Sequence, residues 1–148
     1  MVRLMRIAEI LRRKGCEVAT VTPGTTVRAL LAVLAEHNIG AVVVSPGGGR
    51  ISGIVSERDV VRGLHEYGAG LLDTPVSDIM TTPVRTCAPE DRVDGLRRIM
   101  TEHRVRHLPV VRGDRLVGIV SIGDVVKSAI SELATERQLL VDYVQGRY

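Results

Sequence analysis

The sequence predicts an α+β fold built from two copies of one unit, and three observations support this. A ten-residue step at residues 53–62 returns at residues 118–127, and seven of its ten positions are identical. In both copies the apolar spacing predicts the order strand, helix, strand, strand, helix. Upstream of the step, four residues recur at an offset of 66: Thr20, Pro23, Val27 and His37 answer to Thr86, Pro89, Val93 and His103.

Each unit has about 60 residues and a small sheet that is apolar on one side, which makes it marginally stable alone. We therefore expect the two β-α-β-β-α repeats to pack sheet to sheet around a pseudo-twofold axis, with a cleft between them. The expected parts are an N-terminal helix and lead-in at 1–17, repeat one at 18–67, a linker and short helical lead-in at 68–82, repeat two at 83–135, and a helical extension and tail at 136–148.

The elements of each repeat follow from period-two and helical spacing bounded by Pro and Gly turns. In repeat one we expect a strand at 18–21, a helix from 27 to 34, strands at 41–45 and 51–55 around a glycine turn, and a helix from 56. In repeat two we expect a strand at 84–87, a helix from 93 to 100, a hairpin around 112–114, and a helix from 121 that continues toward 140 and 144.

Helix starts and connections complete this prediction. Thr25 or Thr26 is the expected N-cap of the first repeat's helix, and Asp91 that of the second. Residues 67–74 contain two glycines and are expected to form a linker, and residues 75–80 a short helical lead-in. The matching lead-in at the N-terminus is a helix across Leu4, Ile7, Ala8 and Leu11, and at the other end Arg147 and Tyr148 are expected to fray.

Composition excludes several classes of protein. The 148 residues are 45% hydrophobic, with no Trp, no Phe and three Tyr, so no aromatic platform for single-stranded nucleic acid can form. The net charge of +3 leaves duplex DNA open, but arginines interspersed with acids are typical of a solvated surface. Cys16 and Cys87 are isolated, and no signal peptide or long apolar run occurs. We expect a cytoplasmic protein without metal or membrane partners.

The repeated step allows two interpretations. Ser56 followed by Asp59, and Ser121 followed by Asp124, match a capping box at the start of an apolar helix. The same geometry suits a binding site, since a carboxylate in the first turn of a helix can accept both hydrogen bonds of a ribose diol. Both interpretations remain open at this point.

The two hairpins start differently. Repeat one has the small residues Gly40 and Ala41 after Ile39, which allow the backbone to approach a flat ring. Repeat two has Arg106 and His107 in the equivalent place, and these side chains could hold phosphate. An exposed strand edge would explain the same two residues.

The doubled Gly-Ile-Val-Ser-x-x-Asp-Val-Val step resembles a tandem pair of CBS domains, a Bateman module, as do the hairpins His-Asn-Ile-Gly-Ala-Val-Val-Val and His-Arg-Val-Arg-His-Leu-Pro-Val-Val. The resemblance covers residues 5–135 and extends to small stand-alone bacterial CBS-pair signalling proteins. It implies a regulatory adenine nucleotide in the cleft, AMP first and otherwise ADP, ATP, NAD or S-adenosylmethionine. It also implies a homodimer of CBS pairs.

On the family pattern, Asp59 and Asp124 would hold ribose, with Ser56 and Ser121 as short polar companions. Arg106 and His107 could serve either site, because phosphates in this family point to the centre of the cleft. Arg58 would add a phosphate contact that repeat two lacks. The resemblance groups Asp124 with Thr20, Ile39, Gly40 and Ala41, and Asp59 with Thr86, Val105, Arg106 and His107.

The function expected is therefore that of a non-catalytic module that binds adenine nucleotide and signals to an effector protein on another chain. Relatives inside inosine monophosphate dehydrogenase suggest an enzyme, but 148 residues cannot form a barrel of about 250 residues, and no nucleophile motif is present. A nucleic-acid-binding regulator would need a contiguous arginine face, which Arg97, Arg98 and Arg104 could begin. A purely structural dimerisation module with an empty cleft would share every fold prediction.

Overall fold

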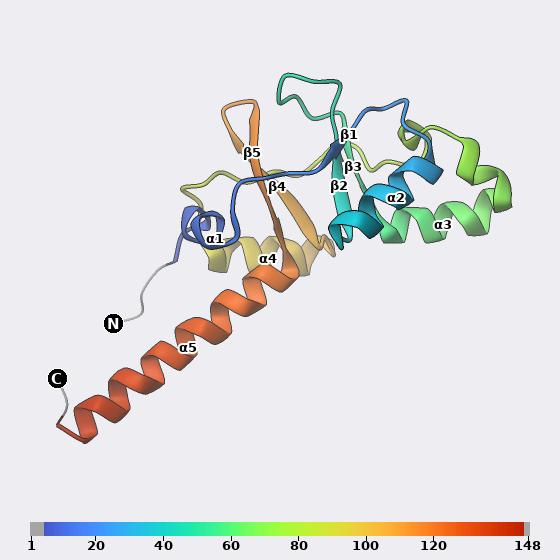
Figure 1. Cartoon of the computed structure of the whole chain (residues 1–148). Helices are drawn as coiled ribbons and strands as arrows, with labels where there is room; N and C mark the ends of the chain where they lie inside the picture. The colour runs from blue at the N-terminus through green and yellow to red at the C-terminus, as the bar shows by residue number, and fades with distance from the viewer. Residues whose placement is uncertain (1–4, 147–148) are drawn as a thin grey trace.

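The computed structural model describes residues 5–146, which form two small sheets flanked by helices (Figure 1). The first sheet has the order β1-β2-β3, with β1 parallel and β3 antiparallel to β2, and the second pairs β4 with β5 antiparallel. The elements are α1 (Ile7–Lys14), β1 (Thr20–Val21), α2 (Val27–His37), β2 (Ala41–Val44), β3 (Gly53–Ser56), α3 (Glu57–Tyr67), the 3₁₀ helices η1 (Gly68–Asp73) and η2 (Val76–Asp78), α4 (Val93–His103), β4 (His107–Arg112), β5 (Arg115–Ser121) and α5 (Ile122–Val144).

The order of elements confirms the predicted repeat and its α+β class. Helices α2 and α4 end alike, because Asn38 and Arg104, 66 residues apart, both adopt left-handed backbone at the C-cap. The N-terminal lead-in helix is present as α1, although Leu4 lies outside the described residues. The last helix reaches Val144 as expected. Arg147 and Tyr148, which were expected to fray, also lie outside the described residues.

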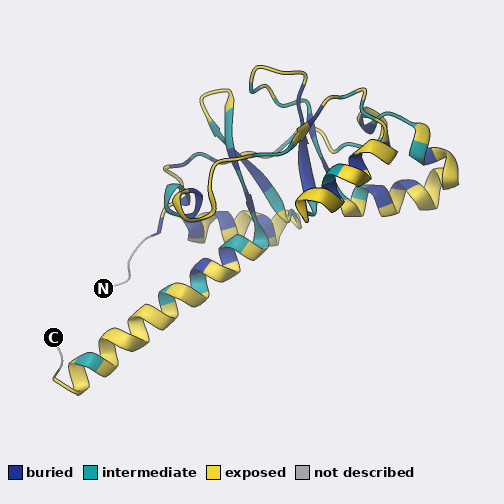
Figure 2. Ribbon diagram, viewed as in Figure 1, coloured by how far each residue is buried: buried dark blue, intermediate teal, exposed yellow. Residues whose placement is uncertain are grey.

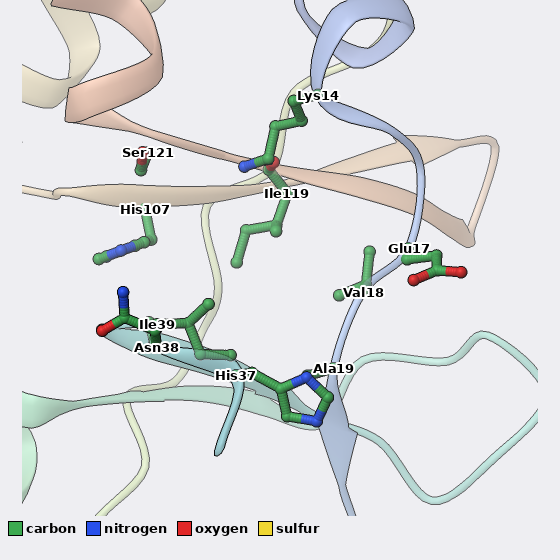
Figure 3. A pocket seen from close by; sticks show the side chains of 12 residues that line it. Lys14, Glu17, Val18, Ala19, His37, Asn38, Ile39, His107, Ile119 and Ser121 are labelled. Atoms are coloured by element: carbon green, nitrogen blue, oxygen red, sulfur yellow. The ribbon is translucent and has the colours of Figure 1, made fainter. Parts of the chain in front are cut away.

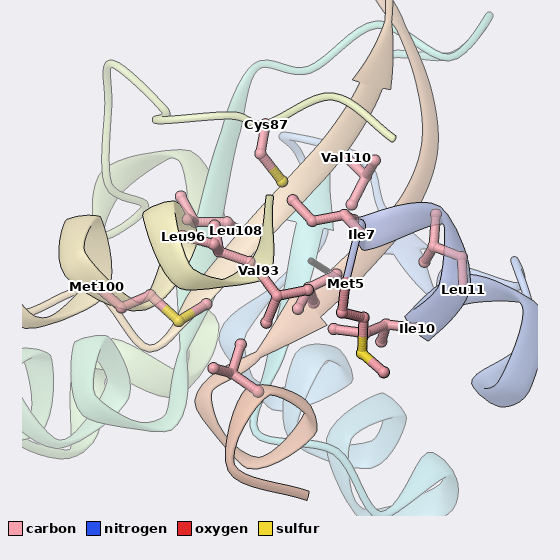
Figure 4. Packing of buried hydrophobic residues seen from close by; sticks show 12 residues of the cluster. Met5, Ile7, Ile10, Leu11, Cys87, Val93, Leu96, Met100, Leu108 and Val110 are labelled. Atoms are coloured by element: carbon pink, nitrogen blue, oxygen red, sulfur yellow. The ribbon is translucent and has the colours of Figure 1, made fainter. Parts of the chain in front are cut away.

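Each lead-in segment packs against the other repeat. Helix α1 shares a buried cluster with α4, β4, β5 and α5, in which Ile7 and Leu108 are almost fully buried (Figure 4). The segment before repeat two contributes Leu71 and Val76 to the cluster of repeat one. Backbone bonds repeat the exchange, since Val93 N–H donates to Met5 and Val27 N–H donates to Thr74. The two repeats are thus joined by contacts from the N-terminal segment and from the segment between the repeats.

The predicted strand at 84–87 is wrong except at its last residue. Cys87 forms a single parallel bridge with Val110, through Cys87 N–H to Pro109 O and Val111 N–H to Cys87 O. The next bond upstream would need an N–H from residue 109, and proline has none. In repeat one the equivalent residue is Val43, and there the strand extends to Thr20.

Two local predictions also need correction. Thr26 is the N-cap of α2, and its side chain accepts from Ala29 N–H, but the N-cap of α4 is Arg92 and not Asp91. The Asp91 carboxylate instead accepts from Ala88 N–H at 2.8 Å and closes the preceding turn. The predicted linker is a 3₁₀ helix whose Leu71 is fully buried over Gly63.

Candidate functional site

Both repeated steps form complete capping boxes. Ser56 is the N-cap of α3, its Oγ accepts from Asp59 N–H, and Asp59 Oδ2 accepts from Ser56 N–H at 2.9 Å. Ser121 and Asp124 repeat this at the start of α5, with the same 2.9 Å bond from Ser121 N–H to Oδ2. The structural interpretation of the motif is therefore confirmed. Each box places a carboxylate at the edge of its sheet, beside a segment of the other repeat's lead-in.

Those lead-in segments satisfy the two carboxylates differently. At Asp59, the Thr81 hydroxyl donates to Oδ1 at 3.2 Å, and Thr81 N–H donates to Ile54 O at 2.8 Å. At Asp124, the ammonium of Lys14 donates both to Oδ2 at 2.6 Å and to Ile119 O at 2.9 Å. One side chain thus replaces a backbone bond and a hydroxyl bond.

A cavity of about 690 Å³ lies between the repeats on the Asp124 side (Figure 3). This volume is within the range of small-molecule sites, about 300–1,000 Å³. Its lining comes from the α1–β1 segment, the end of α2 with the start of β2, and the facing strands of repeat two. The lining residues are Lys14, Glu17, Val18, Ala19, His37, Asn38, Ile39, Gly40, Ala41, His107, Ile119 and Ser121.

The arrangement within the cavity is apolar at its centre and charged at one end. Ile39 and Ile119 point toward one another from the two repeats in Figure 3. The Lys14 ammonium lies at the end beside Ile119, where it is bound to Asp124. Such a cavity has aliphatic walls for a flat ring and polar groups for its substituents.

Electrostatics at this end depend on Lys14. Burial favours the neutral acid at Asp124, but hydrogen bonds from Lys14 and Ser121 outweigh it and lower the pKa of that carboxyl. Burial lowers the pKa of His107, and the Lys14 ammonium lowers it further, against the opposing effect of Asp124 and Glu57. Both shifts favour a neutral imidazole beside an ionised carboxylate.

The structure brings five of the predicted site residues onto the cavity, namely Ile39, Gly40, Ala41, His107 and Ser121, with Asp124 joined to it through Lys14. His107 interacts with Glu57 and Asp124, so it lies between the starts of α3 and α5. Outside the cavity lining are Ser56, Asp59, Arg58, Thr20, Thr86, Val105 and Arg106. Of these, Val105 packs against the core of repeat two. Ile119, which was not among the predicted site residues, lines the cavity.

Sequence reasoning missed Lys14, and the repeat carried a signal for it. At the offset of 66, Lys14 and Gly15 correspond to Met80 and Thr81. A long side chain in that place, one residue before a segment that faces the other repeat, could have been recognised as a replacement for the Thr81 contact. His37 was noted only as a mark of the repeat, and it also lines the cavity.

The described residues contain little that suggests catalysis or metal chemistry. Burial raises the pKa of the Cys87 thiol to about 12, with a further contribution from Asp91, so this thiol is not a nucleophile at neutral pH. Within residues 5–146, no three metal-ligating side chains come together. None of the helices in the same range combines the length and apolar character that a bilayer span requires.

Comparisons with known proteins show the family of the chain. The family model described as CBS domain matches residues 7–66 and 76–131. The mitochondrial CBS domain-containing protein CBSX3 of Arabidopsis thaliana is 40% identical over 131 residues, which are 86% of this chain and 64% of the plant protein, so the chain spans less than two thirds of that relative.

Solved structures show the same fold. The CBS-domain protein ATU1752 of Agrobacterium tumefaciens is 42% identical, with a TM-score of 0.82 over 84% of this chain and 99% of that one. The CBS pair of protein MJ0100, solved with 5′-methylthioadenosine and S-adenosyl-L-methionine, is 22% identical, with a TM-score of 0.79 over 88% of this chain and 99% of that one. The chain belongs to the CBS-domain family and carries two tandem CBS domains.

Proposed function

We propose that the chain is a non-catalytic regulatory module that binds an adenine nucleotide, AMP first, between its CBS domains and signals occupancy to a separate protein. CBS-pair proteins are regulatory modules, and both ligands of the MJ0100 pair contain adenosine. The observation that carries the proposal is the cavity lined by Ile39 and Ile119, with Asp124 bound to Lys14 at one end of it.

The adenine ring would lie between the two isoleucines. The chain has no Phe and no Trp, and no tyrosine is among the described residues that line the cavity, so aliphatic side chains would supply both faces of a base site there. Ile39 and Ile119 come from different repeats and face one another across the cavity (Figure 3). A Cβ at Gly40 would lie 3.6 Å from both His107 and Glu57, an ordinary contact distance, so Gly40 lies directly beside these two side chains. A bound base would therefore touch both repeats at once.

The ribose would bind Asp124. An ionised carboxylate accepts hydrogen bonds from both hydroxyls of a vicinal diol, and such charge-assisted bonds are stronger than neutral ones. The hydrogen bonds from Lys14 and Ser121 keep Asp124 ionised. Asp59, with Ser56, Arg58 and Thr86, would form a second site of the same kind.

Because the ligand would bridge the repeats, it would favour one relative arrangement of them over others. A partner that reads that arrangement would then respond to nucleotide by a shift in population. Signalling in this form needs no chemical step.

Calorimetry with AMP, ATP, NAD and S-adenosylmethionine tests the proposal. We expect Asp124→Asn to weaken binding by about tenfold or more, since a charge-assisted pair is lost while an acceptor for Ser121 N–H remains. Asp114→Asn, at an exposed hairpin turn, is the matched control and should bind as the wild type does. The proposal is wrong if none of the four ligands binds below about millimolar concentration, an affinity of roughly 4 kcal/mol.

We also propose that two copies pair through α3 and α5. Much of the surface of α3 and α5 is exposed (Figure 2). Val61 and Val126 occupy the same place in the two repeats and are 65% and 50% exposed, and Ile130 is 63% exposed. Apolar side chains repeated in this way form a symmetric patch that a second copy can cover. Light scattering should give the mass of a dimer for the wild type and of a monomer for Val126→Asp. A monomeric wild type at high concentration would contradict the pairing.

A further inference from the structure

The ammonium of Lys14 occupies one oxygen, Oδ2, of the carboxylate that the proposed function assigns to ribose. Its distance to Asp124 Oδ2 is 2.6 Å, and the two side chains are 33% and 21% exposed. The same nitrogen donates to Ile119 O at 2.9 Å and lines the cavity (Figure 3). Oδ2 also accepts Ser121 N–H at 2.9 Å, so a ribose diol cannot bind both carboxylate oxygens of Asp124 while the ammonium remains on Oδ2.

The Lys14 side chain can change its position, whereas Thr81, which makes the equivalent contact with Asp59 in the other half, is held in place. Thr81 is held by its own backbone, which exchanges two hydrogen bonds with Ile54 at 2.8 and 3.2 Å. Lys14 reaches Asp124 through a flexible four-carbon side chain from the last residue of α1. The ammonium can therefore leave Asp124 without any change in the packing of α1.

The free energy of ligand binding depends on the new partner of the Lys14 ammonium once it has left Asp124. A neutral adenosine compound would break the ion pair and offer the lysine no opposite charge in return. An anionic compound would offer its phosphate or carboxylate as a new partner within the same cavity. Glu17, which does line the cavity, points away from the ammonium in Figure 3, so its carboxylate is not an alternative partner.

We propose that Lys14 makes the Asp124 site selective for adenosine ligands that carry an anionic group, by exchanging Asp124 for that group when ribose binds the carboxylate. This proposal rests on the function proposed above and adds the residue that sets its ligand class. It predicts that AMP binds more tightly than adenosine. Cationic adenosine compounds should bind more weakly than adenosine.

The test compares AMP with adenosine by calorimetry on three proteins: wild type, Lys14→Met and Lys127→Met. Methionine keeps an unbranched chain and removes the charge. Lys127 is the other lysine of the sequence and lies exposed on α5, which makes it the matched control for net charge. Thermal unfolding of each variant checks that the fold is retained.

In the wild type, AMP should bind at least about tenfold more tightly than adenosine, the size expected for one charge-assisted contact. In Lys14→Met, adenosine should gain affinity and AMP should lose it, so that the ratio falls to about threefold or less. Lys127→Met should keep the wild-type ratio.

The possible failures are distinguishable. If Lys14→Met keeps the wild-type ratio, the selectivity assigned to Lys14 is wrong while the nucleotide site stands. If the wild type binds adenosine as tightly as AMP, the exchange does not occur. If neither compound binds to any of the three proteins, the proposed function is wrong and the role of Lys14 falls with it.

Discussion

The two helix-initiating aspartates occupy equivalent places in the two repeats and are held in different ways. Asp59 contacts Thr81, whose backbone is paired with β3. Asp124 contacts Lys14, whose side chain alone reaches β5. A backbone pairing is part of the fold, whereas a side chain can change partners at little cost to the fold. The two halves are therefore alike in fold but differ in how firmly each aspartate is held, and under the proposed function the two sites would differ in their readiness to bind a ligand.

The lead-ins that carry these contacts also pack differently. Gly118 of β5 lies under Leu11, whose Cδ2 is 2.7 Å from the point where a Cβ on residue 118 would lie, and Leu11 is 5% exposed. Gly53 of β3 lies under Met80, whose Sδ is 2.6 Å from the equivalent point on residue 53, and Met80 is only half-buried. The N-terminal lead-in is therefore held by its core contact, and the inter-repeat lead-in by its backbone pairing.

Truncation of these two side chains should give the largest effect. We expect Leu11→Ala to lower the free energy of unfolding by about 2–5 kcal/mol, because it leaves a cavity in the core of repeat two. Met80→Ala should lower it by about half as much, since its side chain is partly exposed and its backbone bonds remain. Urea unfolding measures both.

Leu139→Ala on the exposed part of α5, where this leucine is 64% exposed, is the control and should change stability by less than about 0.5 kcal/mol. Equal losses for Leu11→Ala and Met80→Ala would contradict the distinction between a lead-in held by its side chain and one held by its backbone.

Much of the fold follows from short-range signals in the sequence. The serine and aspartate of each step are three residues apart, so their capping box is local and can be predicted from spacing alone. The missing strand near Cys87 depends on Pro109, which has no N–H to donate to a neighbouring strand. Pro109 is distant in sequence, so the pattern at residues 84–87 alone cannot predict this loss.

The site was harder to predict because its members come from both repeats. Ile39 and Gly40 could be predicted from the contrast between the hairpins, and Asp124 from the doubled step. Lys14 could not be paired with Asp124 from local pattern, since 110 residues separate them. Only the exchange of lead-ins between repeats brings them together, and that exchange is a property of the tertiary packing.

Substitution of His107 should have the smallest effect on stability, and it tests the difference between the repeats most specifically. It corresponds to Ala41, because each pairs with the serine of its own step, Ser121 or Ser56. The pKa of His107 is lowered by burial and by Lys14, so the folded protein resists a proton that the unfolded chain accepts. Stability from this group is complete above the unfolded pKa of about 6.5 and is lost as pH falls toward the folded value.

We therefore expect the free energy of unfolding to fall as pH drops below about 6.5, and to fall less steeply in His107→Ala, with at most one proton involved. His103→Ala, at the exposed end of α4, should keep the wild-type slope. Lys14→Met should raise the pKa of His107, which NMR titration of the imidazole measures, because it removes the cation that most opposes protonation. An unchanged His107 pKa in Lys14→Met would mean that the lysine spends its time away from Asp124, and the contrast between the two aspartates would then lose its basis.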